Sequence, residues 1–237
     1  MKLSRDITRY MHFVFDELLP PQLRDARWFM VPFLRLATKS KAEYFIDFKE
    51  RAHSLSENEF RHYYEETYGI LNRETDLNQS CIEAILNDVG TGSILEVGCG
   101  NGYLLQKLSS PHRTLSAVDV NVSDTTKAAC KDVTFHEGPL EQMDFVTETY
   151  DTVVCTHTLE HVRNLTASLQ HLRRVARKQL LIVVPCQREY QYTFDLHLSF
   201  FPYRHSLLHA FQPPKNAVVK LQKLHGDWYY TETYPTL

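Results

Sequence analysis

The segment Ser93–Leu105, with the sequence SILEVGCGNGYLL, constrains the fold of this chain more than any other stretch. Apolar residues lead into Glu96, three glycines alternate at Gly98, Gly100 and Gly102, and apolar residues then resume. This order predicts a buried strand, a tight glycine turn and the first turn of a helix. Because glycine has no Cβ, it accepts positive φ angles and lets a ligand approach the backbone closely.

The spacing of these glycines distinguishes between two kinds of ligand. A dinucleotide pyrophosphate requires G-x-G-x-x-G, whereas this chain has G-x-G-x-G with Glu96 two positions before the first glycine. A carboxylate at that position would repel a pyrophosphate but would suit the ammonium group of an amino acid. The spacing therefore disfavours a nicotinamide oxidoreductase. A turn that merely tolerates glycine is the plainer alternative, although three alternating glycines cost chain entropy if nothing uses them.

The motif E-V-G-C-G-N-G resembles the first motif of the class I S-adenosylmethionine-dependent methyltransferases. The resemblance implies an α/β fold, with a doubly wound, mostly parallel, Rossmann-like sheet. It also implies S-adenosyl-L-methionine as the cofactor and S-adenosyl-L-homocysteine as its product. The motif residues expected to contact the cofactor are Glu96, Gly98, Cys99, Gly100, Asn101 and Gly102.

A second strand is predicted at Thr114–Asn121, with Asp119 near its carboxyl end. In an open α/β sheet the ligand crevice lies at the carboxyl ends of adjacent strands. An acidic residue there can accept hydrogen bonds from two ribose hydroxyls, and the resemblance implies this role for Asp119, with Val120 beside it. The alternative role for Asp119 is a helix N-cap or a turn residue.

The third strand, Val133–Phe135, is followed by Gly138-Pro139-Leu140-Glu141, where the family often has Gly-Asp close to the adenine. Pro139 offers neither a carboxylate nor an N–H group. Any adenine contact is therefore expected from Leu140 or Glu141.

The fourth strand is predicted at Tyr150–Thr156, and the residues after it resemble the Leu-Glu-His-Val helix of ubiquinone- and menaquinone-biosynthesis methyltransferases. The resemblance implies that Thr156 and His157 lie beside the reactive sulfonium. We expect His161 to face the site and Glu160, on the same helix, to face away from it.

A continuous apolar run rich in β-branched residues, Leu180–Pro185, predicts a central parallel strand that is buried on both faces. The aromatic and histidine-rich stretch after it lies where substrate loops belong, and its aromatic residues are candidates either for the core or for stacking on an acceptor. An oxygen or nitrogen acceptor can require a base, for which His161 and His197 are the candidates. Two alternating segments near the C-terminus predict an antiparallel hairpin.

Only helical patterns precede Ser93, so we expect an N-terminal helical extension, residues 1–75, and a methyltransferase domain, residues 76–237. The extension is expected either to form a lid over the cofactor or to face the acceptor or a membrane. Helices are predicted at Ala42–Arg51, at Glu57–Tyr68 with a Ser56/Glu59 capping box, and at Asp76–Val89 with Thr75 as its cap.

Residues 1–41 carry eight basic and four acidic residues, a net charge of +4, beside the apolar run Trp28–Leu34. One interpretation is two helices packed on the core, with Pro32 interrupting any long helix. The other is a basic, aromatic surface that makes peripheral contact with an anionic membrane or a large acceptor.

The composition is globular, with 237 residues, 43% of them hydrophobic, and a formal net charge of −3 that argues against nucleic acid. The five cysteines are scattered and form no C-x-x-C pair, so we expect no metal site and a reducing, cytoplasmic compartment, with the inner membrane face open as a peripheral location. The expected acceptor is a small molecule or a glycan- or lipid-linked intermediate. The methylated atom and the oligomeric state stay open, and a non-catalytic S-adenosylmethionine-binding or scaffold protein is the alternative.

Overall fold

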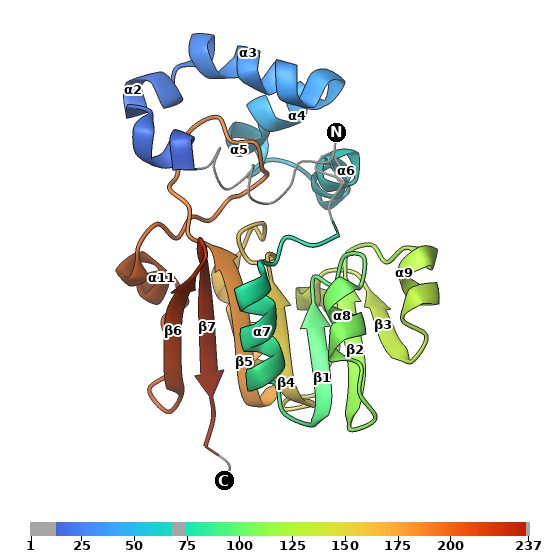
Figure 1. The fold of residues 1–237 in the computed structure, drawn as a ribbon. Helices are drawn as coiled ribbons and strands as arrows, with labels where there is room; N and C mark the ends of the chain where they lie inside the picture. The colour runs from blue at the N-terminus through green and yellow to red at the C-terminus, as the bar shows by residue number, and fades with distance from the viewer. Residues whose placement is uncertain (1–12, 68–73, 236–237) are drawn as a thin grey trace. The chain divides into compact units, whose positions relative to one another are not determined.

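The computed structural model describes residues 13–67 and 74–235 and divides into two compact units, each described here by itself (Figure 1). The helical unit comprises residues 1–73 and 187–202. The sheet unit comprises residues 74–186 and 203–237. The chain therefore leaves the sheet unit after its fifth strand, contributes a segment to the helical unit, and returns.

The sheet unit contains a seven-stranded sheet in the order β3-β2-β1-β4-β5-β7-β6. Strands β1 to β5 pair in parallel, and β7 pairs antiparallel with both β5 and β6. The predicted fold class, a mostly parallel sheet that ends in an antiparallel hairpin, is confirmed. The strands are β1 (Gly92–Val97), β2 (Arg113–Asp119), β3 (Val133–Glu137), β4 (Tyr150–Thr156), β5 (Ala176–Pro185), β6 (Val218–Leu224) and β7 (Asp227–Thr233).

Helices flank this sheet, and α7 and α8 lie over the same face of it in Figure 1. Apolar residues of both helices pack in one cluster with Ile94 of β1, Leu181 of β5 and Tyr229 of β7. Helix α10 contacts β4 and β5. The helices of this unit are α7 (Gln79–Asp88), α8 (Tyr103–Leu108), α9 (Asp124–Ala129), the 3-10 turn η3 (Leu140–Gln142), α10 (Leu165–Val175) and α11 (Arg204–Phe211).

Helix α7 begins later than the sequence predicted. The side chain of Asn78, not that of Thr75, caps it, because Oδ1 of Asn78 accepts the N–H of Cys81 over 2.8 Å. The hydroxyl of Thr75 instead accepts the N–H of Leu77 in the turn before the helix. At a helix start, an asparagine side chain accepts a backbone N–H group as well as a threonine side chain does. The helix therefore begins after Asn78, which lies closer than Thr75 to the buried apolar residues of α7.

Asp151 holds β1, β4 and β5 together at the amino ends of the strands. Its carboxylate accepts the N–H of Ser93 over 3.1 Å and lies 2.7 Å from the guanidinium of Arg177 and 2.8 Å from Nζ of Lys178. Burial alone would raise the pKa of Asp151, but hydrogen bonds from Lys178, Arg177 and Ser93 hold it below its usual range. The ionised carboxylate therefore favours the parallel alignment that places the carboxyl ends of these strands together.

The helical unit is built around an apolar core of its own, which includes Met30, Leu34, Phe45 and Phe48. The capping box between Ser56 and Glu59 is confirmed, with 2.8 Å between Ser56 N and the Glu59 carboxylate, whereas the predicted end of that helix lies outside the described residues. The elements are η1 (Val14–Leu18), α2 (Pro21–Arg24), α3 (Arg27–Thr38), η2 (Lys39–Lys41), α4 (Ala42–Ile46), α5 (Phe48–Arg51) and α6 (Glu57–Thr67).

Two expectations about this unit are wrong. Pro32 does not interrupt a helix, because α3 runs through it from Arg27 to Thr38. The buried side chains of Met30 and Leu34 hold both halves of α3 on the core, which offsets the hydrogen bond that proline removes. Residues 187–202, expected in the methyltransferase domain, belong to the helical unit.

The aromatic residues of that returning segment explain its place. Tyr190, Tyr192 and Leu196 are buried in the core of the helical unit, and Phe194 packs against it. These side chains therefore take the first of the two roles that the sequence left open. In the part of the chain that the structure describes, no helix is both long and apolar enough to cross a bilayer.

Candidate active site

The glycine turn joins β1 to α8, and its three glycines all have positive φ angles. A Cβ on Gly98 would lie 1.9 Å from Oγ1 of Thr158, and one on Gly102 would lie 2.9 Å from Sγ of Cys130. A Cβ on Gly100 would meet nothing within 4 Å. Gly98 and Gly102 are therefore required by packing inside the sheet unit, whereas Gly100 borders open space where a ligand can approach the backbone.

Asp119 lies beside this turn because β1 and β2 pair in parallel, with Val97 opposite Val118. Its Oδ2 accepts the N–H of Gly100 over 2.8 Å, and its Oδ1 accepts the N–H of Asn121 over 3.3 Å. Burial raises the pKa of this carboxyl, and the N–H groups oppose that rise. The predicted meeting of the two strand ends is observed, and Val120, the next residue, is exposed.

Glu96 is the second carboxyl group at this end of the sheet. It is 2% exposed, and its Oε2 has no hydrogen-bond partner among the residues that the structure describes. Burial, together with the nearby Asp119, raises the pKa of Glu96 well above its usual range. A buried carboxyl without a partner is costly, and a cationic group offsets that cost. The site therefore fits the ammonium group of an amino-acid moiety, such as the methionine part of S-adenosylmethionine.

The remaining residues of the first motif have structural contacts. The Asn101 side chain donates from Nδ2 to the carbonyl of Glu74 over 2.7 Å and accepts the N–H of Tyr103 over 3.2 Å, which holds the start of α8. Burial raises the pKa of the Cys99 thiol, so this cysteine is a packing residue and not a thiolate nucleophile. After β3, Leu140 is buried and begins the turn η3, in which Glu141 follows.

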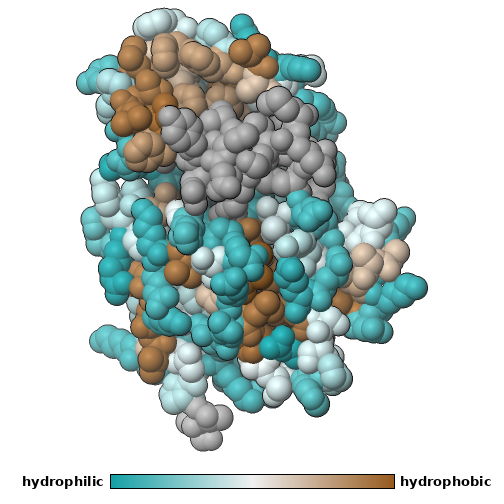
Figure 2. All heavy atoms as spheres, viewed as in Figure 1, coloured by the Kyte–Doolittle hydropathy of each residue, from teal (hydrophilic) through white to brown (hydrophobic). Residues whose placement is uncertain are grey.

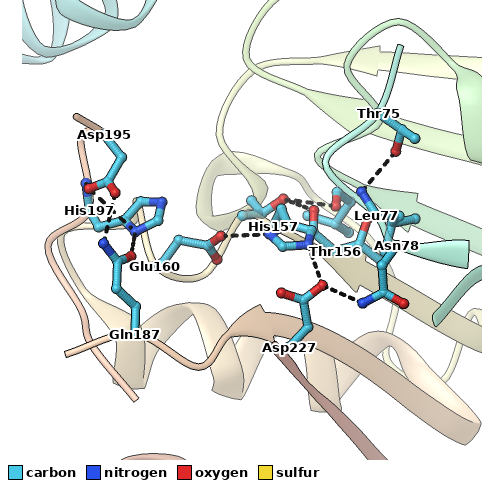
Figure 3. Close-up of polar contacts among 12 residues, drawn as sticks. Thr75, Leu77, Asn78, Thr156, His157, Glu160, Gln187, Asp195, His197 and Asp227 are labelled. Carbon is cyan, nitrogen blue, oxygen red and sulfur yellow. Dashed lines mark hydrogen bonds and ion pairs between the residues drawn. The ribbon is translucent and has the colours of Figure 1, made fainter. Parts of the chain in front are cut away.

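His157 follows Thr156 at the carboxyl end of β4 and has a positive φ of 49°. Its Nδ1 lies 3.3 Å from Oε1 of Glu160, and its Nε2 lies 3.5 Å from Oδ2 of Asp227 (Figure 3). The same Oδ2 of Asp227 accepts a hydrogen bond from Nδ2 of Asn78 over 2.8 Å. The imidazole is therefore held between carboxylates from two different segments.

The charge of His157 follows from this geometry. Burial lowers the pKa of the imidazole, but the carboxylates of Asp227 and Glu160 outweigh burial and raise it to about 10. His157 is thus an imidazolium near neutral pH, with both ring nitrogens protonated, and it is no proton acceptor there. Its two ion pairs connect the end of β4 with Glu160 in the turn that follows and with Asp227 at the start of β7.

The sequence did not predict this network. Asn78 and Asp227 are almost 150 positions apart, and no local pattern connects the start of α7 with the start of β7. The capping preference for asparagine could have identified Asn78 as a helix start, but it could not have identified its bond to Asp227.

The expectation that Glu160 shares a helix with His161 and faces away from the site is wrong. Residues 159–161 form a turn, and α10 begins only at Leu165. The reason is the cap, because Oδ1 of Asn164 accepts the N–H of Ala167 over 3.0 Å and starts the helix there. Glu160 contacts His157, while His161 is partly exposed in the same turn.

His197 belongs to the helical unit, whereas His161 belongs to the sheet unit. Nδ1 of His197 lies 2.7 Å from Oε1 of Gln187 and 3.5 Å from Oδ1 of Asp195. Nε2 of Gln187 donates in turn to Oδ2 of Asp195 over 3.0 Å. These contacts orient the ring of His197 within its own unit.

Comparison with known proteins identifies the sheet unit. Residues 95–184 match a family model described as a methyltransferase domain. The match contains the glycine turn, Asp119 and the end of β4. The class defined by this match and by the fold is that of the class I S-adenosylmethionine-dependent methyltransferases.

Relatives of known name match part of the chain. The chain is 31% identical over 111 residues to the ubiquinone biosynthesis O-methyltransferase of Rickettsia typhi, covering 41% of this chain and 44% of that protein. It is 35% identical over 85 residues to the malonyl-[acyl-carrier protein] O-methyltransferase of Bacillus cereus, covering 33% and 31% of the two chains. The alignments thus span less than half of the length of these two relatives.

Solved structures share the fold. A 1,6-didemethyltoxoflavin-N1-methyltransferase of Burkholderia thailandensis, solved with S-adenosylhomocysteine, superposes with a TM-score of 0.60 at 14% identity and covers 76% of this chain and 87% of that one. A putative methyltransferase of Haloferax volcanii, solved with its Trm112 activator, gives a TM-score of 0.54 at 11% identity, with 80% and 98% covered.

Proposed function

We propose that this chain transfers a methyl group from S-adenosylmethionine to a small-molecule, glycan-linked or lipid-linked acceptor. The observation that supports this most is the arrangement at the carboxyl ends of β1 and β2. There the buried, unpartnered oxygen of Glu96, the open space at Gly100 and the carboxylate of Asp119 lie around one turn. A strand–helix turn that binds no ligand does not require all three of these features.

Each residue has a distinct proposed role toward the cofactor. Glu96 binds the ammonium group, Gly100 allows close approach to the backbone, and Asp119 accepts hydrogen bonds from the ribose hydroxyls. Leu140 and Glu141 are proposed to lie along the adenine, and Thr156 and His157 near the methyl group. When bound, the cofactor supplies a methyl group on a good leaving group, so positioning of the acceptor accounts for much of the acceleration.

On the acceptor side, we propose His161 and His197 as the groups that orient the acceptor or take its proton. The names of two relatives include O-methyltransferase, and this supports an oxygen nucleophile here as well. Oxygen nucleophiles are stronger after loss of a proton, and histidine is the side chain best suited to accept one near neutral pH.

Two measurements on the whole chain test this proposal. First, S-adenosylmethionine and S-adenosylhomocysteine should raise the melting temperature, whereas NAD should not, because only a ligand of the folded state stabilises it. Second, methyl-labelled cofactor should label a component of a small-molecule, glycan or lipid extract. Binding without any transfer supports the non-catalytic alternative, and stabilisation by NAD alone overturns the proposed cofactor.

A further inference from the structure

Helix α3 of the helical unit is apolar on two opposite faces. Its inward face buries Met30, Val31, Leu34 and the methyl-bearing Thr38 in the core. Its outward face presents Trp28, Phe33 and Leu36, which are 73%, 45% and 79% exposed, together with exposed Pro32. At 100° per residue these outward residues share one side of the helix.

Exposed apolar residues are concentrated in this part of the molecule. Nine large hydrophobic residues of the described chain are exposed, and five of them lie between Phe13 and Leu36. Figure 2 shows brown side chains over α2 and α3, besides others over the sheet unit. Isolated exposed apolar residues are ordinary, but a contiguous group that includes a tryptophan marks a contact surface.

Exposed basic residues lie at both ends of α3. Arg27 precedes Trp28, Arg35 precedes Leu36, and Lys39 follows the last turn of α3. Arg35 lies 3.1 Å from the carboxylate of Glu43, and both side chains stay about 60% exposed. A surface with tryptophan, phenylalanine and leucine between basic side chains is complementary to the headgroups and upper acyl chains of an anionic bilayer.

The geometry favours a bilayer over a folded protein partner. α3 has 12 residues, about 18 Å at ~1.5 Å per residue, too short to cross a membrane. A stable protein–protein contact needs roughly 800 Å² on each partner, which is more than one face of a three-turn helix provides. A lipid surface needs no matching groove, because acyl chains adapt to whatever side chains enter them.

We propose that the outward face of α3 is a membrane-contact surface that lies in the headgroup region of an anionic bilayer. Trp28, Phe33 and Leu36 enter the lipid, and Arg27 and Lys39 bind headgroup phosphates. This inference rests on α3 and its surroundings and not on methyl transfer, and it holds whether the acceptor is a lipid or a dissolved molecule.

The two tryptophans of the chain make the test direct. Trp28 is 73% exposed and Trp228 only 8%, so a shift of the fluorescence to shorter wavelength reports on Trp28. We expect this shift when the full chain meets vesicles of phosphatidylcholine with phosphatidylglycerol at low salt. It should be absent with phosphatidylcholine alone and reversed by high salt. Trp28→Phe should still sediment with the vesicles but show no shift.

Variants separate the apolar from the electrostatic contribution. Leu36→Ser should weaken sedimentation with the anionic vesicles about tenfold, since the side chain loses a buried apolar contact. The double variant, Arg27→Gln with Lys39→Gln, should weaken sedimentation more than tenfold, because the loss of each charge weakens it about fivefold. Val218→Ser is the matched control, because Val218 is 74% exposed, close to the 79% of Leu36, but lies on β6.

Several results would overturn the proposal. The first is that the chain stays in solution with anionic vesicles at low salt. The second is that Val218→Ser weakens binding as much as Leu36→Ser does. The third is that Leu36→Ser abolishes self-association in the ultracentrifuge while vesicles bind neither form, which would assign the surface to a second copy of the chain. Unchanged melting temperatures will show that the variants fold.

Discussion

The backbone N–H of Gly100 donates a hydrogen bond of 2.8 Å to Oδ2 of Asp119. This contact connects the turn after β1 with the end of β2. It holds the carboxylate in place before any ligand binds, and such preorganisation lowers the cost of binding.

Asp119→Ala should therefore weaken the binding of S-adenosylmethionine and S-adenosylhomocysteine by about 10- to 100-fold. The physical reason is the loss of hydrogen bonding to a charged group, which contributes roughly 1.5–3 kcal/mol. Isothermal calorimetry measures the affinity. Asp132→Ala, an exposed carboxylate before β3, is the control. Equal affinities for both variants would rule out the proposed ribose contact.

The glycines of the turn should separate stability from binding. Gly98→Ala should lower the free energy of unfolding by more than ~2 kcal/mol, because its Cβ collides with Thr158 and its φ of 77° is left-handed. Gly100→Ala should cost only ~1 kcal/mol, since no atom lies within 4 Å of its Cβ, but it should weaken cofactor binding more than tenfold. Urea unfolding and calorimetry measure the two effects. Similar stabilities for both variants would contradict the distinct roles assigned to them.

The imidazolium of His157 should give the protein a pH-dependent stability. Its pKa is about 10 in the folded protein, above the ~6.5 of an unfolded chain, so its contribution is complete below about pH 6.5 and is lost as the pH rises toward 10. His157→Gln removes the titrating group. The difference in unfolding free energy between the wild type and this variant should therefore shrink across that window, measured by urea unfolding at several pH values.

A control variant distinguishes this effect from general alkaline destabilisation. His112→Gln changes an exposed histidine before β2 and should track the wild type at every pH. A constant difference between wild type and His157→Gln from pH 6.5 to 10 would contradict the bridged imidazolium.

The candidate acceptor-side histidines make a prediction about turnover. His161→Ala or His197→Ala should lower kcat by ~10²-fold or more while the cofactor affinity changes little, which is the expected result of losing a base or an orienting group. Steady-state transfer from labelled cofactor measures kcat once an acceptor is known. His209→Ala and His53→Ala are exposed controls in the sheet unit and the helical unit. Normal turnover in both test variants would mean that another group activates the acceptor or that none is needed.

The sequence by itself determined the fold class and the cofactor end of the site. The glycine spacing, Glu96 and Asp119 are local signals, because a strand, a turn and a helix start are each defined by a few neighbouring residues. The parallel order of the strands then brings their carboxyl ends together, so the position of Asp119 beside the turn follows from topology alone.

The tertiary structure alone decided which side chains meet over long distances in the chain. Glu160 contacts His157 because Asn164, four positions later, starts the helix, and Asp227 reaches the same imidazole from β7. The aromatic segment 187–202 belongs to the helical unit because its aromatic and apolar side chains are buried in the core of that unit. The spacing of apolar residues in the sequence shows which faces of a helix are apolar. Only the packed structure shows which of these faces is buried and which, as on α3, stays exposed.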